Sequence, residues 1–219
     1  MNLINTSELL GLGNLPPDSL AKKEVRAAMR AKTGAISTKS ATGKAMYERL
    51  LYMLPADIQA NVKNGRLQLV DEILYSVKRV PENFSDQELM ESGDNKTYGL
   101  TNVDKRKIEA NKWTLLCGLQ LLSGVAAKPE ETEFAVCDKK ILNGEFELEV
   151  GNTVIVPNIS CTVFDTKGRT DVAKGLWTEF DPAFITPNTE IKPRLKMSEP
   201  APANFNVYFA MHCVSVAKG

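Results

Sequence analysis

The pair His212 and Cys213 is the first place in this 219-residue chain to look for nucleophilic chemistry, because His212 is its one histidine. A cysteine nucleophile needs a base whose side chain meets its thiol. The surrounding segment, FNVYFAMHCV at 205–214, has the composition of a β-strand, in which neighbouring side chains point to opposite faces. We therefore expect that His212 does not activate Cys213. A single histidine also excludes a three-histidine metal site and a histidine-dependent serine triad.

Paired carboxylates, such as Asp71-Glu72 and Glu130-Glu131, are the groups with which a glycosidase works. Such an enzyme holds its two acids at a defined separation, which adjacency in the sequence does not establish. Because the chain has 27 Asp and Glu, we interpret these pairs as solvated surface. We therefore predict that the protein is not an enzyme and that it uses no cofactor or metal. A hydrolase that works with carboxylates alone is the third hypothesis, after two non-enzymatic ones.

The cysteines show neither C-x-x-C spacing nor a neighbouring set of histidines, so we expect no zinc site. Each lies in or next to an apolar run, where a reduced cysteine packs as a small hydrophobic residue. The four are Cys117, Cys137, Cys161 and Cys213. The start of the chain lacks a secretory pattern, which favours synthesis in a reducing compartment. All apolar runs are shorter than the roughly 20 residues that cross a bilayer, so we expect no membrane span.

Aromatic residues provide candidate binding platforms. Trp177, Phe180 and Tyr208 are the residues that we consider for contact with a sugar or a protein partner. Burial in a core is the alternative for Trp177 and Phe180, and it is the one that we favour. Trp113 begins a series of apolar residues at every second position, which continues to Leu119. This spacing predicts that Trp113 lies in the core.

Positive charge is concentrated near the start of the chain. Residues 1–50 hold eight Lys and Arg against four Asp and Glu, although the formal net charge of the whole chain is zero. The densest group is Lys22, Lys23, Arg26 and Arg30. Such a segment is able to make weak, salt-dependent contact with a nucleic-acid backbone or an acidic partner. It has no interleaved aromatic residues with which to stack on bases. The alternative interpretation is the solvated face of an ordinary helix.

Alternation of apolar and polar residues predicts that the chain is mainly β. It is plainest in EFELEV at 145–150, where Phe146, Leu148 and Val150 face a core while three glutamates face water. Similar runs, most of them bounded by Gly, Pro or Asn, predict eight strands at 73–80, 112–123, 133–137, 144–150, 153–164, 176–180, 190–197 and 205–216. Eight strands with irregular loops favour an antiparallel β-sandwich, specifically a single jelly roll, over an up-and-down barrel.

The predicted organisation has two parts. Residues 1–65 form a basic helical N-terminal arm, and residues 66–219 form the sandwich, with a long polar loop at 81–111. Within the arm, strong helix formers predict a helix at 18–32 and a second one at 42–54, joined by a linker rich in Ser, Thr and Gly.

The last element of the arm is a short helix that begins near Pro55. It turns Ile58 and Val62 inward and stops at Asn64-Gly65, residues that are typical of a helix C-terminus.

Three segments of the predicted sandwich resemble phage capsid proteins with jelly-roll folds: LVDEILY at 69–75, KWTLLCGLQLL at 112–122 and NGEFEL at 143–148. The resemblance covers residues 66–219. It implies subunits that assemble through sheet edges, loops and swapped arms into a shell or vertex, with the arm ordered only in the assembly. The apolar residues expected to contact other subunits are Leu9, Leu10, Leu12, Met46, Leu50 and Met53. Packing within their own domain is the alternative.

The leading functional hypothesis is therefore a self-assembling structural protein of a virion, either a capsid or a vertex component. It is made in the host cytoplasm, and its partners are copies of itself and other virion proteins. The second hypothesis is a β-sandwich module that binds carbohydrate or a protein partner.

Overall fold

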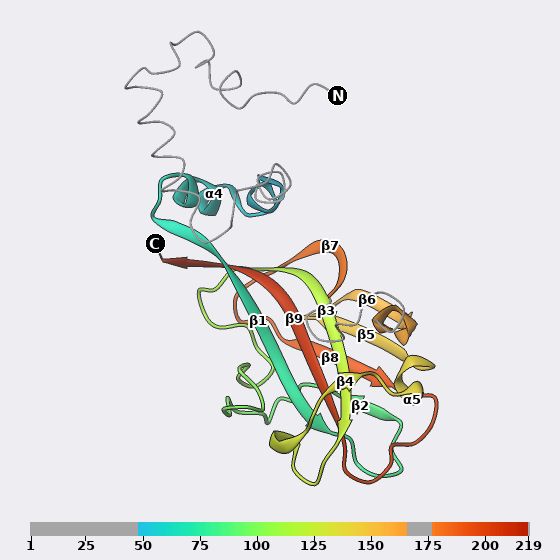
Figure 1. The fold of residues 1–219 in the computed structure, drawn as a ribbon. Helices are drawn as coiled ribbons and strands as arrows, with labels where there is room; N and C mark the ends of the chain where they lie inside the picture. The colour runs from blue at the N-terminus through green and yellow to red at the C-terminus, as the bar shows by residue number, and fades with distance from the viewer. Residues whose placement is uncertain (1–47, 166–176, 219) are drawn as a thin grey trace, which may run out of the picture. The chain divides into compact units, whose positions relative to one another are not determined.

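The structure, a computed structural model, describes residues 48–165 and 177–218 (Figure 1). These residues fall into two compact units. One is the described part of Met1–Val70 together with Ala217 and Lys218, and the other is the described part of Asp71–Val216. The predicted helix at 18–32 and the linker that follows it lie outside the described residues.

The smaller unit contains a helical segment at 48–52 and helix α4 (Ala56–Lys63). Pro55 is the N-cap of α4, next to the first turn, where the missing N–H of a proline breaks no helical hydrogen bond. Ile58 and Val62, which lie one turn apart, are both buried. The helix ends at Lys63 with Asn64 as its C-cap, and the φ angle of 73° at Gly65 is one that glycine adopts without strain. The predicted short helix, its inward residues and its stop are confirmed.

The larger unit is built on two antiparallel sheets, and the prediction of a mainly β chain is confirmed. The first sheet has the order β1-β9-β3, and the far edge of β3 pairs with both β4 and β7. The second has the order β2-β8-β5-β6. The strands among the described residues are β1 (Leu67–Arg79), β2 (Asp86–Glu88), β3 (Thr114–Val125), β4 (Ala135–Val136), β5 (Glu145–Val150), β6 (Thr153–Ser160), β7 (Thr178–Ile185), β8 (Ile191–Lys196) and β9 (Phe205–Lys218).

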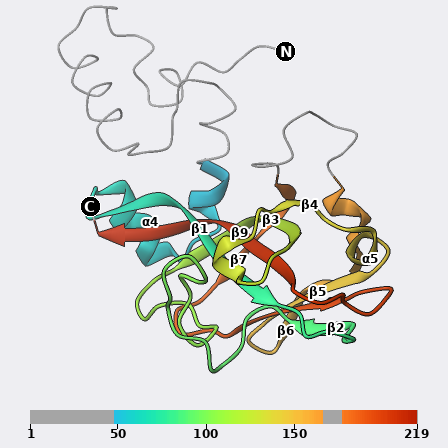
Figure 2. The same ribbon diagram turned by 60° about the horizontal axis from the view of Figure 1, so that its bottom comes forward.

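The strand order is that of a jelly roll. When the two-residue strand β4 is set aside, the first sheet reads β1-β9-β3-β7 and the second β2-β8-β5-β6, so consecutive strands repeatedly cross from one sheet to the other. Figure 2 shows β2, β5 and β6 gathered on one side of β1, β9 and β3. Short helices lie in the connections: η1 (Pro129–Glu131), α5 (Lys139–Leu142) and η2 (Cys161–Phe164).

The core lies between the two sheets and is centred on aromatic rings. Phe146 of β5 packs edge-on against Phe164, with ring centroids 5.6 Å apart. It also packs against Phe209 of β9, whose ring is tilted and whose centroid is 5.5 Å away. Phe146, Leu148 and Val150 are buried while the glutamates between them are not, which confirms the predicted alternation in β5. Burial of each such side chain contributes about 1.5–3 kcal/mol to folding.

Strand β3 departs from simple alternation. Its register with β9 shifts between Leu116 and Gly118, so Cys117 occupies a bulge. The bulge changes which residues face the core: Leu119 lies in the core cluster, whereas Trp113 lies outside it and stacks on Phe184 at 5.3 Å. The prediction that Trp113 belongs to the core is therefore wrong, because a bulge is not visible in an apolar run.

The predicted strands are all present, but their extents differ in places. The strand predicted at 153–164 ends at Ser160, and its last four residues form the short helix η2. Strand β1 begins at Leu67 rather than at residue 73, and β7 continues past Pro182 to Ile185. Proline is tolerated there because β7 pairs with one strand, β3, among the described residues. Strand β2, three residues long, lies inside the segment at 81–111 that was predicted to be a loop.

The segment at 81–111 is held against the edge of β1 by side chains that imitate strand pairing. The side-chain oxygen of Asn102 accepts from the backbone N–H of Tyr75 at 2.8 Å, and its amide donates to the carbonyl of Ile73 at 2.7 Å. Ion pairs from Lys78 of β1 to Asp94 at 2.5 Å and to Glu91 at 3.6 Å fasten it further. The segment thus covers part of an edge that would otherwise be open to another strand.

The central aromatic cluster makes a direct test of the core. We expect Phe146→Ala to lower the free energy of unfolding by about 3–5 kcal/mol, because the side chain is fully buried between the sheets. A urea titration of the full chain measures this. Phe84→Ala is the control, with an expected change within about 0.5 kcal/mol, since Phe84 is 58% exposed. Equal losses from the two changes would contradict the described packing.

Candidate binding groove

The floor of a groove lies on the outer face of the first sheet, where β3 and β9 pair. Leu122 of β3 stands opposite Tyr208 of β9. Since Val207 and Phe209 turn into the core, the alternation of the strand points Tyr208 outward. Gln120, two residues before Leu122, lies on the same face. The floor is therefore a direct consequence of how β9 fills the core.

One wall of the groove is a segment that we call the lip, residues 128–134, which crosses over β3 at Gly124. A Cβ atom at position 124 would lie 2.5 Å from the backbone oxygen of Glu133 and 2.5 Å from a methyl group of Thr132. Contacts that close force a shift, so the approach requires glycine at this position. The lip contains the turn η1, and it leads into β4, which pairs with β3 through Leu122 and Val136.

Polar side chains hold the lip and the residues just before it in place. The amide nitrogen of Asn206 donates to the hydroxyl of Thr132 at 2.9 Å and to the carbonyl of Ala126 at 3.0 Å. Arg79 of β1 donates to the carbonyls of Ala126, at 3.3 Å, and Ala127. Asn206 is fully buried, so its bonds are shielded from competing water, whereas the bonds of Arg79 are exposed. The wall is thus a fixed part of the fold.

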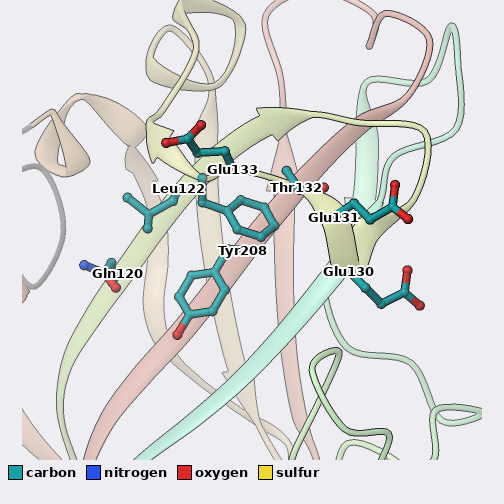
Figure 3. A pocket seen from close by; sticks show the side chains of 8 residues that line it. Gln120, Leu122, Glu130, Glu131, Thr132, Glu133 and Tyr208 are labelled. Carbon is teal, nitrogen blue, oxygen red and sulfur yellow. The ribbon is translucent and has the colours of Figure 1, made fainter.

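The groove has a volume of about 570 Å³ and combines an aromatic floor with an acidic rim. Its lining residues are Gln120, Leu122, Glu130, Glu131, Thr132, Glu133, Phe134 and Tyr208. Figure 3 shows Glu130 and Glu131 on one side of the Tyr208 ring and Glu133 on the other. All three glutamates are exposed. The lining includes no lysine or arginine.

Tyr208 lies at the centre of an aromatic cluster. Its ring stacks on Tyr75 of β1, with centroids 6.0 Å apart, and lies 5.6 Å from Phe134 of the lip. Burial, and then the neighbouring Tyr75, raise the pKa of Tyr208. The phenol therefore stays protonated well above neutral pH, so its hydroxyl is able to donate as well as accept a hydrogen bond.

This combination of groups suits a positively charged ligand. Aromatic faces attract ammonium and guanidinium groups, and carboxylates at the rim pair with them. One cation is already close: Lys128 pairs with Glu131 at 2.9 Å, but both side chains are more than 60% exposed, so the pair exchanges readily with solvent or a ligand.

The surroundings of His212 agree with the sequence interpretation. Cys213 is fully buried in the core cluster, whereas His212 lies partly exposed on the opposite face of β9. The His212 ring lies 5.5 Å from that of Trp177, and its Nε2 atom is 3.7 Å from a carboxylate oxygen of Asp71. His212 and Cys213 are therefore not a catalytic pair.

The other predicted positions are distributed over the molecule. Of the three candidate platforms, Tyr208 lies in the groove, Trp177 lies beside His212, and Phe180 packs against the core. Among the expected subunit contacts, Leu50 is buried and Met53 is partly buried. The remaining ones lie outside the described residues: Leu9, Leu10, Leu12 and Met46, as do the basic residues Lys22, Lys23, Arg26 and Arg30.

Several groove residues were not found from the sequence. Glu130 and Glu131 were noted as a pair, but Thr132, Phe134 and Gln120 were not considered. The proline at 129 and the glycine at 124 are signs of a turn and of a close approach. Neither sign shows that the lip lies over Tyr208, which is 74 residues away from Phe134 in the chain.

Across residues 48–165 and 177–218, no cluster of three or more His, Cys, Asp or Glu is arranged to hold a metal ion. No helix in the same ranges is long and apolar enough to cross a membrane. A scan against models of protein families finds no match, and a search of curated proteins finds no significant one.

The close contact at Gly124 predicts the effect of a single methyl group. We expect Gly124→Ala to displace the lip and to speed backbone hydrogen exchange in residues 130–136 by about tenfold or more, since overpacking of this kind typically costs about 1–3 kcal/mol. Gly93→Ala is the control, because a Cβ atom at Gly93 meets nothing within 4 Å. Unchanged exchange in the Gly124 variant would show that the lip does not lie where it is described.

The buried cysteines give a second prediction. Burial raises the pKa of Cys137 and of Cys213, and it raises that of Cys161 to about 12. Since the thiolate is the reactive form, we expect these three thiols in the folded chain to resist alkylation by iodoacetamide at pH 8 and to react fully in urea. Mass spectrometry after timed labelling measures both. Rapid labelling of Cys213 in the native protein would contradict its burial.

Proposed function

We propose that this chain is a self-assembling structural protein of a virion, a capsid or vertex subunit that contacts its neighbours through its N-terminal segment and its loops. The observation that supports this best is the jelly-roll strand order, an architecture that viral capsid domains share with lectins and cupins. Because a fold does not imply a function, the proposal also needs support from the surface.

Two features of the surface favour contacts through loops and sheet faces. First, strand addition at the edges is hindered: Asn102 covers part of β1, and prolines stand within β6 (Pro157) and β7 (Pro182). Second, the larger unit exposes large hydrophobic side chains on β1 and in the segment at 81–111 that follows it. These are Ile73, Phe84 and Tyr98, which are 47%, 58% and 102% exposed.

Tyr98 is well placed for such a contact. It lies at the turn between Thr97 and Leu100, where the N–H of Leu100 bonds to the carbonyl of Thr97 at 3.0 Å. The segment that carries it is fastened to β1 by Asn102 and by ion pairs. A rigid segment loses little conformational entropy on association, and tyrosine is enriched in interfaces.

The proposal includes location and partners. The protein is part of a virion after synthesis in the host cytoplasm, and its partners are further copies and other virion proteins. Lys22, Lys23, Arg26 and Arg30 supply weak contact with nucleic acid, which is expected to be salt-dependent.

A binding module is the second candidate, and the groove is the specific observation that favours it. A groove of about 570 Å³ with a tyrosine floor and polar rim is large enough for a small ligand, such as a sugar unit, or for a few side chains of a protein partner. This candidate predicts a monomer that binds its ligand without assembling.

The full chain should form closed shells, rings or filaments when concentrated, as seen by electron microscopy and light scattering. Tyr98→Ser should raise the concentration needed for assembly about fivefold or more, as expected for an aromatic residue central to an interface. Val154→Ser, on the 48% exposed Val154 of β6, is the control and should have little effect. A chain that remains monomeric at every concentration would contradict the proposal.

A further inference from the structure

The groove and the start of the chain carry opposite charge. The rim presents three glutamates, and the lining includes no lysine or arginine. Residues 1–47, which lie outside the described residues, hold seven Lys and Arg and three Asp and Glu, a net charge of +4. Since the whole chain is neutral, with 27 charges of each sign, residues 48–219 carry a net charge of −4. The rim and the start of the chain are therefore complementary in charge, and the exposed pair of Glu131 with Lys128 is one that a second cation is able to replace.

We infer that the Tyr208 groove binds the basic segment 22–30 of a second copy of this chain. This rests on the proposed function, self-assembly, and names one of the contacts through which it occurs. Lys22, Arg26 and Arg30 are spaced four residues apart, so they share one face of the helix predicted at 18–32.

That face matches the chemistry of the groove. Between Lys22 and Arg30, eight positions further on, an α-helix rises about 12 Å, which would spread the three cations along its length. The apolar stems of Lys and Arg pack on Tyr208 and Leu122, while their charged ends reach the carboxylates of the rim. Exposed charge pairs contribute about 0.2–1 kcal/mol each and are screened by salt, so the contact is weak singly and salt-dependent.

The geometry of such a contact determines the type of assembly. Each copy has one basic segment and one groove, which are different surfaces, so the contact is heterologous, running from one copy to the next. Contacts of this kind close into rings and shells or continue as filaments. A reciprocal exchange, in which each of two copies places its segment in the groove of the other, closes into a two-fold dimer instead.

A complementation experiment with two full-length variants tests the inference. The segment variant carries Lys22→Glu, Lys23→Glu, Arg26→Glu and Arg30→Glu, and the groove variant carries Glu130→Gln, Glu131→Gln and Glu133→Gln. We expect each alone to assemble at least about tenfold more weakly than the wild type, the combined effect of three exposed pairs. Mixed together, they should form 1:1 pairs in sedimentation, because one supplies an intact groove and the other an intact segment.

Two controls exclude effects of charge or folding alone. The first control removes the same charge from three exposed glutamates elsewhere on the larger unit, through Glu82→Gln, Glu145→Gln and Glu179→Gln. This variant should assemble as the wild type does. Tyr208→Leu should weaken assembly about threefold or more, as loss of a cation–π contact predicts, and Tyr208→Phe, which keeps the ring, should weaken it less.

The outcomes separate the inference from the proposed function. If the wild type assembles and the groove variant assembles equally well, the groove inference is wrong and the proposed function stands. Lack of pairing in the mixture would overturn the contact between copies. If the wild type never assembles, the proposed function fails, and a fluorescent peptide of residues 18–34 titrated into the segment variant tests the groove separately. Binding that is lost when Glu130, Glu131 and Glu133 become Gln would support the groove, and absence of binding would overturn it.

Discussion

Burial of apolar side chains between the two sheets is the interaction on which the rest of this structure depends. Phe146 and Phe209 meet across the sheets, and their burial sets the register of the strands that carry them. Because strand side chains alternate, a residue placed between two core residues must face outward. Tyr208 is such a residue, between Val207 and Phe209. The floor of the groove is thus a consequence of the core, and a slip of one residue would bury Tyr208 and expose Phe209.

Two features outside the core shape the surface of this sandwich. The lip approaches β3 closely because position 124 lacks a side chain, and Asn206 bonds the lip to β9. On the other edge of the sheet, Asn102 occupies hydrogen-bonding groups of β1. Such edge protection hinders non-specific strand addition at this part of β1. The proposed virion function and the proposed contact between copies both draw on these features.

Alternation and turn residues were sufficient to predict the fold, because a half-buried strand has a period of two wherever one face meets a core. The eight predicted strands are present, and so is the helix that stops at Gly65. The bulge at Cys117 was not predictable, since an apolar run looks the same with or without it, and Trp113 was misplaced as a result. Strand β2 is too short to show a pattern. The groove needs contacts between residues far apart in sequence, such as Phe134 and Tyr208, which local patterns do not contain.

The most direct test of this account is zero-length cross-linking of amines to carboxylates in assembled protein, with equal amounts of ¹⁴N- and ¹⁵N-labelled copies. The account predicts mixed-isotope cross-links from Lys22 or Lys23 to Glu130, Glu131 or Glu133, formed at low salt and diminished at high salt. It would be contradicted if assembled protein gave cross-links from these lysines only to other carboxylates, or only within single copies.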